Sequence, residues 1–363
     1  MAHPRTTRTT GPRVDFSESY DPSVLKGRSA LVTGGSLGIG HGCVESLAEN
    51  GVYVTFADVN AEAGQAAEKE LKDKGLNVQF VQTDVSSWEA LVAVFKAAVA
   101  FSPSNTVDIV IPNAGVGGVS VAHWLSNTPV NSVTNDPLPP PTRCADINYM
   151  AVRNTIYAAM YYFRNFPGKE DATHSKQIIF VASMAGYSPM ASVIDYNSSK
   201  WGVRGMFWAL RNVPHILGEG KPLFRVNLIA PTWVKTNLTA RFQQLIEGGN
   251  STVKMAEVSD CTDVVLRMAS DEKVVGRAAA IAADKKSFDV CDESEGPGAA
   301  QVLNDPEYLK FFGYGPAVEV SKKPSEADSA KFLDSAASEK VPNPTVLSVE
   351  DSLKAAVPVP NAA

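Results

Sequence analysis

Cysteine and histidine are scarce in this sequence of 363 residues, which contains only four cysteines and five histidines. Neither residue type is spaced as in a metal site, so we expect no bound metal. No Cys-x-x-Cys pair occurs either, which predicts free thiols in a reducing compartment for Cys43, Cys144, Cys261 and Cys291.

Long basic runs and long apolar runs are also missing. Lysine and arginine total 33 against 39 for aspartate and glutamate, a net charge of −6, so no nucleic acid partner is expected. No apolar stretch approaches the length of about 20 residues that crosses a membrane, and the N-terminus lacks the apolar segment of a signal peptide. We therefore expect a cytoplasmic protein without a membrane span.

What the chain does have is enough apolar material, 44% of its residues, for one large domain with appendages. We expect an N-terminal extension over residues 1–24, an α/β domain over 25–292 and a partly disordered C-terminal extension over 293–363, where Ala, Ser, Pro, Glu and Lys dominate. Residues 117–145 are rich in proline and predict a surface insertion. The aromatic cluster "DPEYLKFFGYGP" is expected to dock on the domain or on a neighbouring subunit.

Short, almost continuously apolar runs alternate with amphipathic helical segments through the domain. Buried parallel strands need apolar residues on both faces, so this alternation predicts a doubly wound, Rossmann-type α/β fold with a seven-stranded parallel sheet flanked by helices. The expected strands are, in order, "SALVTGG", "VYVTFADVN", "NVQFVQTDV", "VDIVIPNAG", "KQIIFVASMAG", "FRVNLIAPTWV" and "GRAAAIAADKKSFDV".

A glycine-rich stretch, "TGGSLGIG", occupies residues 33–40, where the first strand passes into a helix. Glycines there allow a tight turn and close approach to a pyrophosphate, and the helix N-terminus offers free N–H groups. A purely structural turn is the alternative, but the strand before and the helix after favour a dinucleotide site.

Two carboxylates follow the next two strands. Asp58 can accept hydrogen bonds from the adenosine ribose hydroxyls and would repel a 2′-phosphate, which favours NAD over NADP. Leu37 supplies no base for a 2′-phosphate, which agrees with this choice. Asp84 can face the adenine amino group. For each aspartate, capping of the following helix remains an alternative.

The fourth expected strand ends in Asn113-Ala114-Gly115. Small residues there leave room for a cofactor ribose, while Asn113 can brace the neighbouring strands, and both roles are compatible.

Tyr196 stands four positions before Lys200 in "VIDYNSSKWG". A phenol has a pKa near 10 and is a poor proton carrier at neutral pH, but a lysine one helical turn away favours the phenolate, as would the positive charge of an oxidised nicotinamide ring. Ser183, just past the fifth expected strand, can hold a substrate oxygen near the phenol. We interpret the three residues as an acid/base site, with a surface Tyr/Lys pair as the alternative.

Taken together, the glycine loop, the "NAG" turn, Asn148 in "DINYM", Ser183 and the Tyr-x-x-x-Lys motif resemble the short-chain dehydrogenase/reductase superfamily over residues 25–292. Finer features, "FADVNAEAG" and "RMASDEKVVGRAAAI", resemble its hydroxyprostaglandin-dehydrogenase-like branch and fungal secondary-metabolism relatives. The resemblance implies a homodimer or homotetramer.

The resemblance also implies a role for each catalytic residue. Tyr196 is the acid/base, Lys200 lowers its pKa and binds the nicotinamide ribose, Ser183 orients the carbonyl or alcohol, and Asn148 holds a water in a proton relay. For Asn148, a structural role at a helix kink remains open.

After the sixth strand the family has Pro-Gly before a threonine that meets the nicotinamide carboxamide. Here Pro231 is followed by Thr232 in place of the glycine, and Val234 and Thr236 are the expected carboxamide contacts. The full set of expected cofactor-binding residues is Gly34, Ser36, Leu37, Gly38, Ile39, Asp58, Val59, Asp84, Val85, Asn113, Ala114, Gly115, Tyr196, Lys200, Pro231, Val234 and Thr236.

The expected substrate pocket is apolar. Its predicted lining is Ser183, Met184, Tyr187, Met190, Val193, Tyr196 and Trp233, although some of these side chains could pack in the core instead. Residues 237–249 occupy the position of the family's mobile lid. We therefore expect an NAD-dependent oxidoreductase that interconverts a bulky apolar secondary alcohol and its ketone. The alternatives are an epimerase, dehydratase or cyclisation catalyst that holds NAD(P) tightly, or a non-catalytic dinucleotide-binding protein.

Overall fold

The computed structural model describes residues 11–168, 174–211, 213–240, 243, 246 and 254–291. The whole C-terminal extension expected over residues 293–363, including its aromatic cluster, and most of the expected lid lie outside these residues. No helix among the described residues is long and apolar enough to cross a membrane.

A single sheet forms the centre of the domain, with the strand order β3-β2-β1-β4-β5-β6-β7-β8. Neighbouring strands pair in parallel up to β7. The strands are β1 (Ser29–Thr33), β2 (Tyr53–Asp58), β3 (Val78–Gln82), β4 (Ile109–Pro112), β5 (Lys176–Val181), β6 (Phe224–Pro231), β7 (Ala278–Ile281) and β8 (Phe288–Asp289). The predicted doubly wound α/β fold is thus confirmed.

The last strand departs from the prediction of seven parallel strands. The segment expected to form one strand over residues 276–290 folds into the hairpin of β7 and β8, in which Ala280 pairs with Phe288 in antiparallel register. Asp284 and Lys285 in its loop both have positive φ, at 60° and 58°, which reverses the chain within a few residues.

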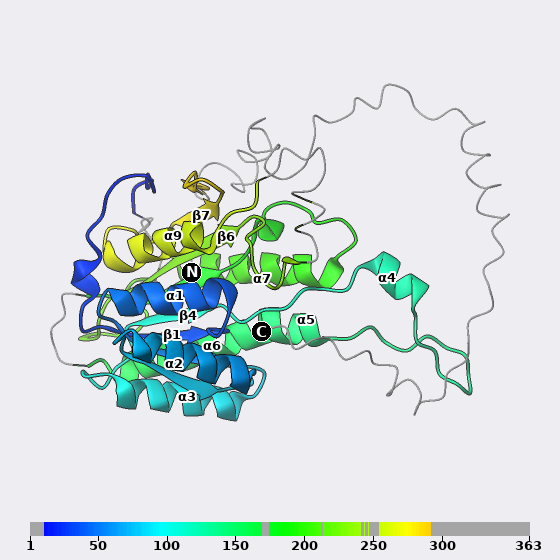
Figure 1. Ribbon diagram of the computed structural model, residues 1–363, viewed down its shortest axis with the longest axis horizontal. Coiled ribbons are helices and arrows are strands. Elements are labelled where there is room, and N and C mark those ends of the chain that lie inside the picture. The colour runs from blue at the N-terminus through cyan, green and yellow to red at the C-terminus, as the bar shows by residue number, and fades with distance from the viewer. Residues whose placement is uncertain are drawn as a thin grey trace, which may run out of the picture.

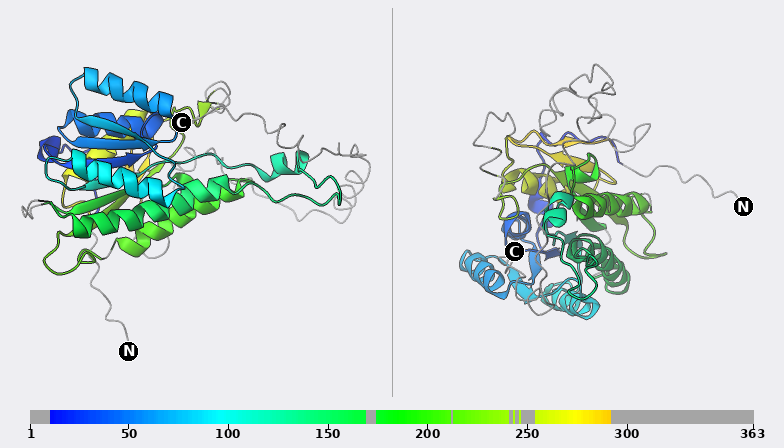
Figure 2. Two further views of the ribbon diagram at one scale, coloured as in Figure 1. Left: turned by 90° about the horizontal axis from the view of Figure 1, so that it is seen from below. Right: turned by 90° about the vertical axis from the view of Figure 1, so that its right-hand side faces the viewer.

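Helices cover both faces of the sheet (Figures 1 and 2). The long helices are α1 (Gly38–Glu49), α2 (Ala61–Asp73), α3 (Trp88–Phe101), α6 (Val152–Asn165), α7 (Ile194–Leu210) and α9 (Val258–Ser270). One apolar core packs Leu47 of α1, Leu71 of α2 and Val265 of α9 on one face, and a second packs Phe95 of α3 and Phe207 of α7 on the other.

These helices form where apolar residues recur every three or four positions, and a polar residue caps some of them. In α6, for example, the buried side chains include Ile156, Ala159 and Phe163. Asn60 caps α2 by accepting a hydrogen bond from the backbone N–H of Ala63.

Between β4 and α6 the chain leaves the body as an arm over residues 117–142. The arm carries α4 (Val121–Ser126) and an isolated antiparallel bridge between Val130 and Pro137, and it projects away from the sheet in Figure 1 and in the left view of Figure 2. It returns through α5 (Arg143–Ala145) and the π-helical turn η2 (Asp146–Ala151) into α6.

The described part of the N-terminal extension packs on the domain. The backbone N–H of Gly11 donates to the carbonyl of Val275 at 2.8 Å, and the N–H of Val14 donates to the carboxylate of Asp289 at 3.0 Å. The Tyr20 hydroxyl donates to the carbonyl of Asp263 in α9. Residues 11–25, which include the 3-10 helix η1 (Pro22–Leu25), therefore cover this edge of the core.

Candidate active site

The carboxyl ends of the parallel strands meet at one edge of the sheet, and three adjoining cavities open there. A strand order that reverses between β1 and β4 creates a crevice at this edge. One cavity, of about 710 Å³, lies beyond β2 and β3, and one of about 130 Å³ lies at the glycine loop. The third, of about 350 Å³, is mostly apolar.

The glycine loop holds the backbone close to β4. Gly34 and Gly38 have positive φ, at 63° and 58°. A Cβ at Gly40 would lie 2.0 Å from the carbonyl oxygen of Gly34, so no side chain fits there. Leu37, at the N-cap of α1, makes no side-chain capping bond, which leaves the first N–H groups of α1 available to an anion at the cavity.

Asp58 ties the end of β2 to this loop. Its carboxylate accepts hydrogen bonds from the backbone N–H of Ser36 at 3.2 Å and of Asn60 at 3.0 Å. The cap of α2 is Asn60, so the alternative that Asp58 caps this helix is wrong. Asp58 is 5% exposed and lines the 710 Å³ cavity, where its free lone pairs can face a ribose.

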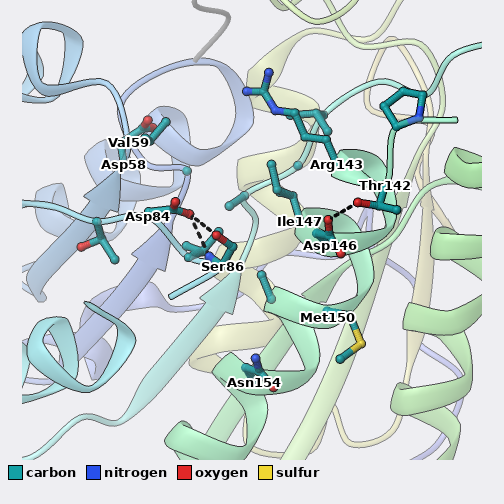
Figure 3. Close-up of a pocket in the computed structure, with 18 residues that line it drawn as sticks. Asp58, Val59, Asp84, Ser86, Thr142, Arg143, Asp146, Ile147, Met150 and Asn154 are labelled. Atoms are coloured by element: carbon teal, nitrogen blue, oxygen red, sulfur yellow. Dashed lines mark hydrogen bonds between the residues drawn. The ribbon is translucent and has the colours of Figure 1, made fainter. Parts of the chain in front are cut away.

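Asp84 lines the same cavity together with Val59 and Val85 (Figure 3). Its carboxylate accepts hydrogen bonds from the backbone N–H and the hydroxyl of Ser86, at 2.9 and 2.7 Å. The cap of α3 is Ser87, so the capping alternative is wrong for Asp84 as well.

Asn113 braces the two strands at the switch point. Its side-chain amide donates to the carbonyl oxygens of Thr33 at 3.1 Å and of Gly34 at 2.8 Å. Ala114 and Gly115 follow it and line both the 710 Å³ and the 130 Å³ cavities. The turn therefore both fixes the glycine loop and leaves space beside it.

Ser183, Tyr196 and Lys200 converge on the cavity at the glycine loop. Ser183 follows β5, and its hydroxyl accepts a hydrogen bond from the N–H of Ala185 at 3.1 Å. Tyr196 lies in the first turn of α7, with Lys200 one turn later. The Lys200 Nζ is 5.7 Å from the centre of the Tyr196 ring and donates to the carbonyl of Val181 at 3.1 Å.

Burial dominates the electrostatics of this group. It raises the pKa of Tyr196, while a side-chain hydrogen bond with Ser183 acts in the opposite direction. It lowers the pKa of Lys200 to about 8, because an ammonium in this apolar setting loses its hydration. The protein by itself therefore does not show the lowered Tyr196 pKa that the sequence predicts. That prediction also counted on the positive charge of a bound oxidised nicotinamide.

Asn148 lies behind the pocket and is fully buried. Its side chain accepts from the backbone N–H of Val116 at 2.8 Å and donates to the carbonyl of the same residue at 2.9 Å. It also donates to the Cys144 sulfur at 3.4 Å. These contacts clamp the π-helical turn to the chain after β4, which is the structural role that the sequence left open, and the side chain does not line any of the three cavities.

The segment after β6 closes the 130 Å³ cavity at the glycine loop from the other side. Pro231, Thr232, Val234 and Thr236 all line it. Thr232 has no positive φ, so the threonine adopts this backbone path without strain, and its N–H donates to the carbonyl of Ile281 at 3.2 Å.

The apolar cavity contains most of the predicted substrate contacts. Its lining includes Ser183, Met184, Met190, Val193, Tyr196 and Trp233. Tyr187 does not line this cavity, so the prediction for it is wrong. It is 1% exposed, belongs to the core and packs its ring 4.0 Å below the Arg204 guanidinium, because it follows the short helix η3 (Met184–Gly186) on the side that faces α7.

Sequence reasoning missed two parts of the lining. One wall of the 710 Å³ cavity comes from the chain that returns from the arm: Pro141, Thr142, Arg143, Asp146, Ile147, Met150, Ala151 and Asn154. The apolar cavity also takes in Gly117 and Gly118 at the start of the arm. The sequence did offer a signal for both segments. Residues 141–154 flank Asn148, and Gly117 and Gly118 closely follow the "NAG" turn.

The site fits a nicotinamide dinucleotide. The uncapped start of α1 suits a pyrophosphate, and Asp58 suits a ribose. The Ser36 hydroxyl in the glycine loop is buried and has no hydrogen-bond partner in the described structure, although it does not line the cavities.

A family model described as short chain dehydrogenase matches residues 28–246. Among curated proteins, the chain is 31% identical over 292 residues to NADP-dependent dehydrogenase M3 of a Phoma species, covering 77% of this chain and 84% of that protein. It is 33% identical over 297 residues to 5′-hydroxyaverantin dehydrogenase of Dothistroma septosporum, covering 79% and 94%.

Solved structures agree on the fold. A short-chain type dehydrogenase/reductase from Mycobacterium marinum superposes with a TM-score of 0.58 at 23% identity, covering 73% of this chain and 98% of that one.

The expectation of fungal secondary-metabolism relatives is confirmed by the two curated dehydrogenases.

Proposed function

Since this chain belongs to the short chain dehydrogenase family, we propose that it interconverts a bulky, largely apolar secondary alcohol and its ketone with NAD as hydride carrier. One observation carries the proposal. Ser183, Tyr196 and Pro231 line both the cavity at the glycine loop and the apolar cavity, so the acid/base group lies where a nicotinamide and an apolar substrate would meet.

The chemistry then divides between cofactor and protein. When bound, the dinucleotide accepts or supplies the hydride. Ser183 holds the substrate oxygen, and Tyr196 takes the hydroxyl proton during oxidation or returns it during reduction. Lys200 lies 5.7 Å from the Tyr196 ring and, when protonated, favours the phenolate by its charge. For Asn148 we propose an indirect role in the proton relay. Its two hydrogen bonds to Val116 hold the η2 turn in place behind the active site.

The substrate proposal rests on the shape and lining of the apolar cavity. Met184, Met190, Val193 and Trp233 give it an apolar wall, and its volume of about 350 Å³ suits a multi-ring or long-chain alcohol. The Dothistroma relative is named for 5′-hydroxyaverantin, which supports an alcohol from secondary metabolism as the substrate class.

The choice of NAD rests on Asp58 and on the apolar side chains of Leu37 and Val59, which offer no charge to a 2′-phosphate. The Phoma relative is named as NADP-dependent, so the cofactor has to be tested in both forms.

We also propose a homodimer or homotetramer. Large aromatic side chains are exposed on α6 and α7, including Tyr157 (61%), Tyr161 (59%) and Trp201 (44%), and these two helices lie in contact. Such a surface fits a second copy of the chain. Sedimentation at several protein concentrations tests this point.

The function is tested with a panel of hydroxylated polyketides, steroids, terpenoids and fatty acids, followed through nicotinamide absorbance with NAD and NADP in parallel. We expect stoichiometric NADH formation with at least one bulky secondary alcohol. Conversion of substrate without net change in the cofactor would instead indicate an epimerase or dehydratase, and binding without any turnover would contradict the proposal.

A further inference from the structure

The large cavity beyond β2 and β3 contains a cation that the sequence analysis did not assign. Arg143, at the start of α5, lines this cavity opposite Asp58 and Val59 (Figure 3). It is the only lysine, arginine or histidine among the residues described as lining the cavity. Its side chain is exposed to solvent, and within the described structure it makes no ion pair or hydrogen bond.

The acidic residues of the same cavity are already engaged. Asp58 accepts from two backbone N–H groups, and Asp84 accepts from the N–H and hydroxyl of Ser86. Asp146, only three residues from Arg143, accepts from the Thr142 hydroxyl at 2.7 Å. Figure 3 shows the last two sets of bonds and the Arg143 side chain apart from them. None of these three carboxylates forms an ion pair with Arg143 in the described structure.

The backbone before Arg143 is restricted. Residues 139–141 are three consecutive prolines, each of which fixes φ near −65°. Behind Arg143, Cys144 is buried and Asn148 is clamped to Val116. Both anchors fix the position of the Arg143 backbone at the cavity wall, so little backbone freedom is lost when its side chain binds a ligand.

We propose that Arg143 binds a phosphate group of the dinucleotide, and this inference rests on the proposed function. A guanidinium offers paired donors that match phosphate oxygens. The cavity that Arg143 lines also contains Gly34 and Asp58, so an adenosine there would bring phosphate oxygens within its reach. Two phosphates share this chemistry, the bridging pyrophosphate of either cofactor and the 2′-phosphate of NADP.

The inference is tested by binding, which needs no substrate. NADH and NADPH are titrated by fluorescence into the full-length wild type, Arg143→Ala and Arg143→Lys, and into the control Arg164→Ala, an exposed arginine in the last turn of α6. We expect Arg143→Ala to weaken binding at least about tenfold, or about 1.4 kcal/mol, with a smaller loss for Arg143→Lys and none for the control. Raising the salt concentration should reduce the difference in dinucleotide affinity between the wild type and Arg143→Ala.

The pattern of losses identifies the phosphate. Equal weakening of NADH and NADPH assigns Arg143 to the pyrophosphate, and weakening of NADPH alone assigns it to the 2′-phosphate; either result supports the inference. Adenosine, which has no phosphate, should compete with NADH equally well in the wild type and in Arg143→Ala. If adenosine lost as much affinity as the dinucleotides, Arg143 would be stacking on the base and the inference would be overturned. Unchanged binding of both dinucleotides to Arg143→Ala would also overturn it.

The two proposals fail in different ways. If the wild type binds neither dinucleotide, the proposed function and this inference both fall. If the wild type binds tightly and Arg143→Ala binds equally well, the inference is wrong while the proposed function stands. Circular dichroism of each variant checks that it is folded, which we expect because the exposed Arg143 side chain has no partner in the described structure.

Discussion

Gly118 places the start of the arm against Tyr196, the proposed catalytic residue, and its substitution by alanine tests how tightly that tyrosine is positioned. A Cβ at this position would lie 2.9 Å from Cγ1 of Val193, 3.0 Å from Cβ of Tyr196 and 3.1 Å from the Tyr196 backbone nitrogen. Gly118 does not have a positive φ, so alanine introduces no backbone strain and acts through its volume alone.

The size of the effect follows from these distances. They are shorter than the 3.4 Å of ordinary contact by up to about 0.5 Å, so the first turn of α7 has to move by about this amount. A misplacement of about 1 Å can cost about a hundredfold in rate, so we expect Gly118→Ala to lower kcat by about tenfold. Overpacking should also lower the free energy of unfolding by about 1–3 kcal/mol.

The matched control is Gly205→Ala in the same helix. A Cβ there has no neighbour within 4 Å, and the residue is exposed in α7. This variant should gain up to about 1 kcal/mol of stability and keep full activity. The assay compares kcat at saturating substrate with NADH affinity. An unchanged kcat in Gly118→Ala, or a loss explained entirely by weaker NADH binding, would refute the reasoning.

Three further changes probe the cofactor cradle and its electrostatics. Gly40→Ala would bring a Cβ within 2.0 Å of the Gly34 carbonyl oxygen, so we expect NADH fluorescence titration to detect no binding and thermal unfolding to show a loss of at least about 2 kcal/mol. Asp58→Ala should weaken NADH binding by about tenfold and NADPH binding less, and equal losses in parallel titrations would contradict the assigned preference. The pKa of Lys200 is about 8 in the folded protein against 10.5 for an ordinary lysine, so the unfolded chain binds more protons between pH 8 and 10. The free energy of unfolding of the wild type should therefore rise with pH by about 1 kcal/mol per pH unit through that window, as measured by urea unfolding. The Lys200→Met variant should lack this rise.

The features that the sequence predicted well are those with a short-range physical cause. Apolar strands and amphipathic helices predicted the doubly wound sheet, and parallel strands bring their carboxyl ends to one edge, where Asp58 and Ser183 were expected and are found. The Tyr196 and Lys200 pair was placed correctly because a four-residue spacing fixes two side chains on one helix face.

The features that the sequence did not predict depend on long-range packing or irregular backbone. Tyr187 was expected in the substrate pocket, but in a non-repeating loop the spacing does not determine which side chain turns inward. The hairpin of β7 and β8 needs positive φ at Asp284 and Lys285, neither of which is a glycine that would have signalled it. Arg143 reaches the cavity only because the chain returns there after the arm.

The proposed mechanism depends on the Tyr196 hydroxyl, which carries the proton of the reaction beside a bound dinucleotide. The most direct measurement is Tyr196→Phe, assayed for turnover and for NADH affinity in the same preparation. Because only the hydroxyl is removed, we expect a fall in kcat of at least about a hundredfold with NADH affinity within about twofold of wild type. Turnover at the wild-type rate in this variant would contradict it.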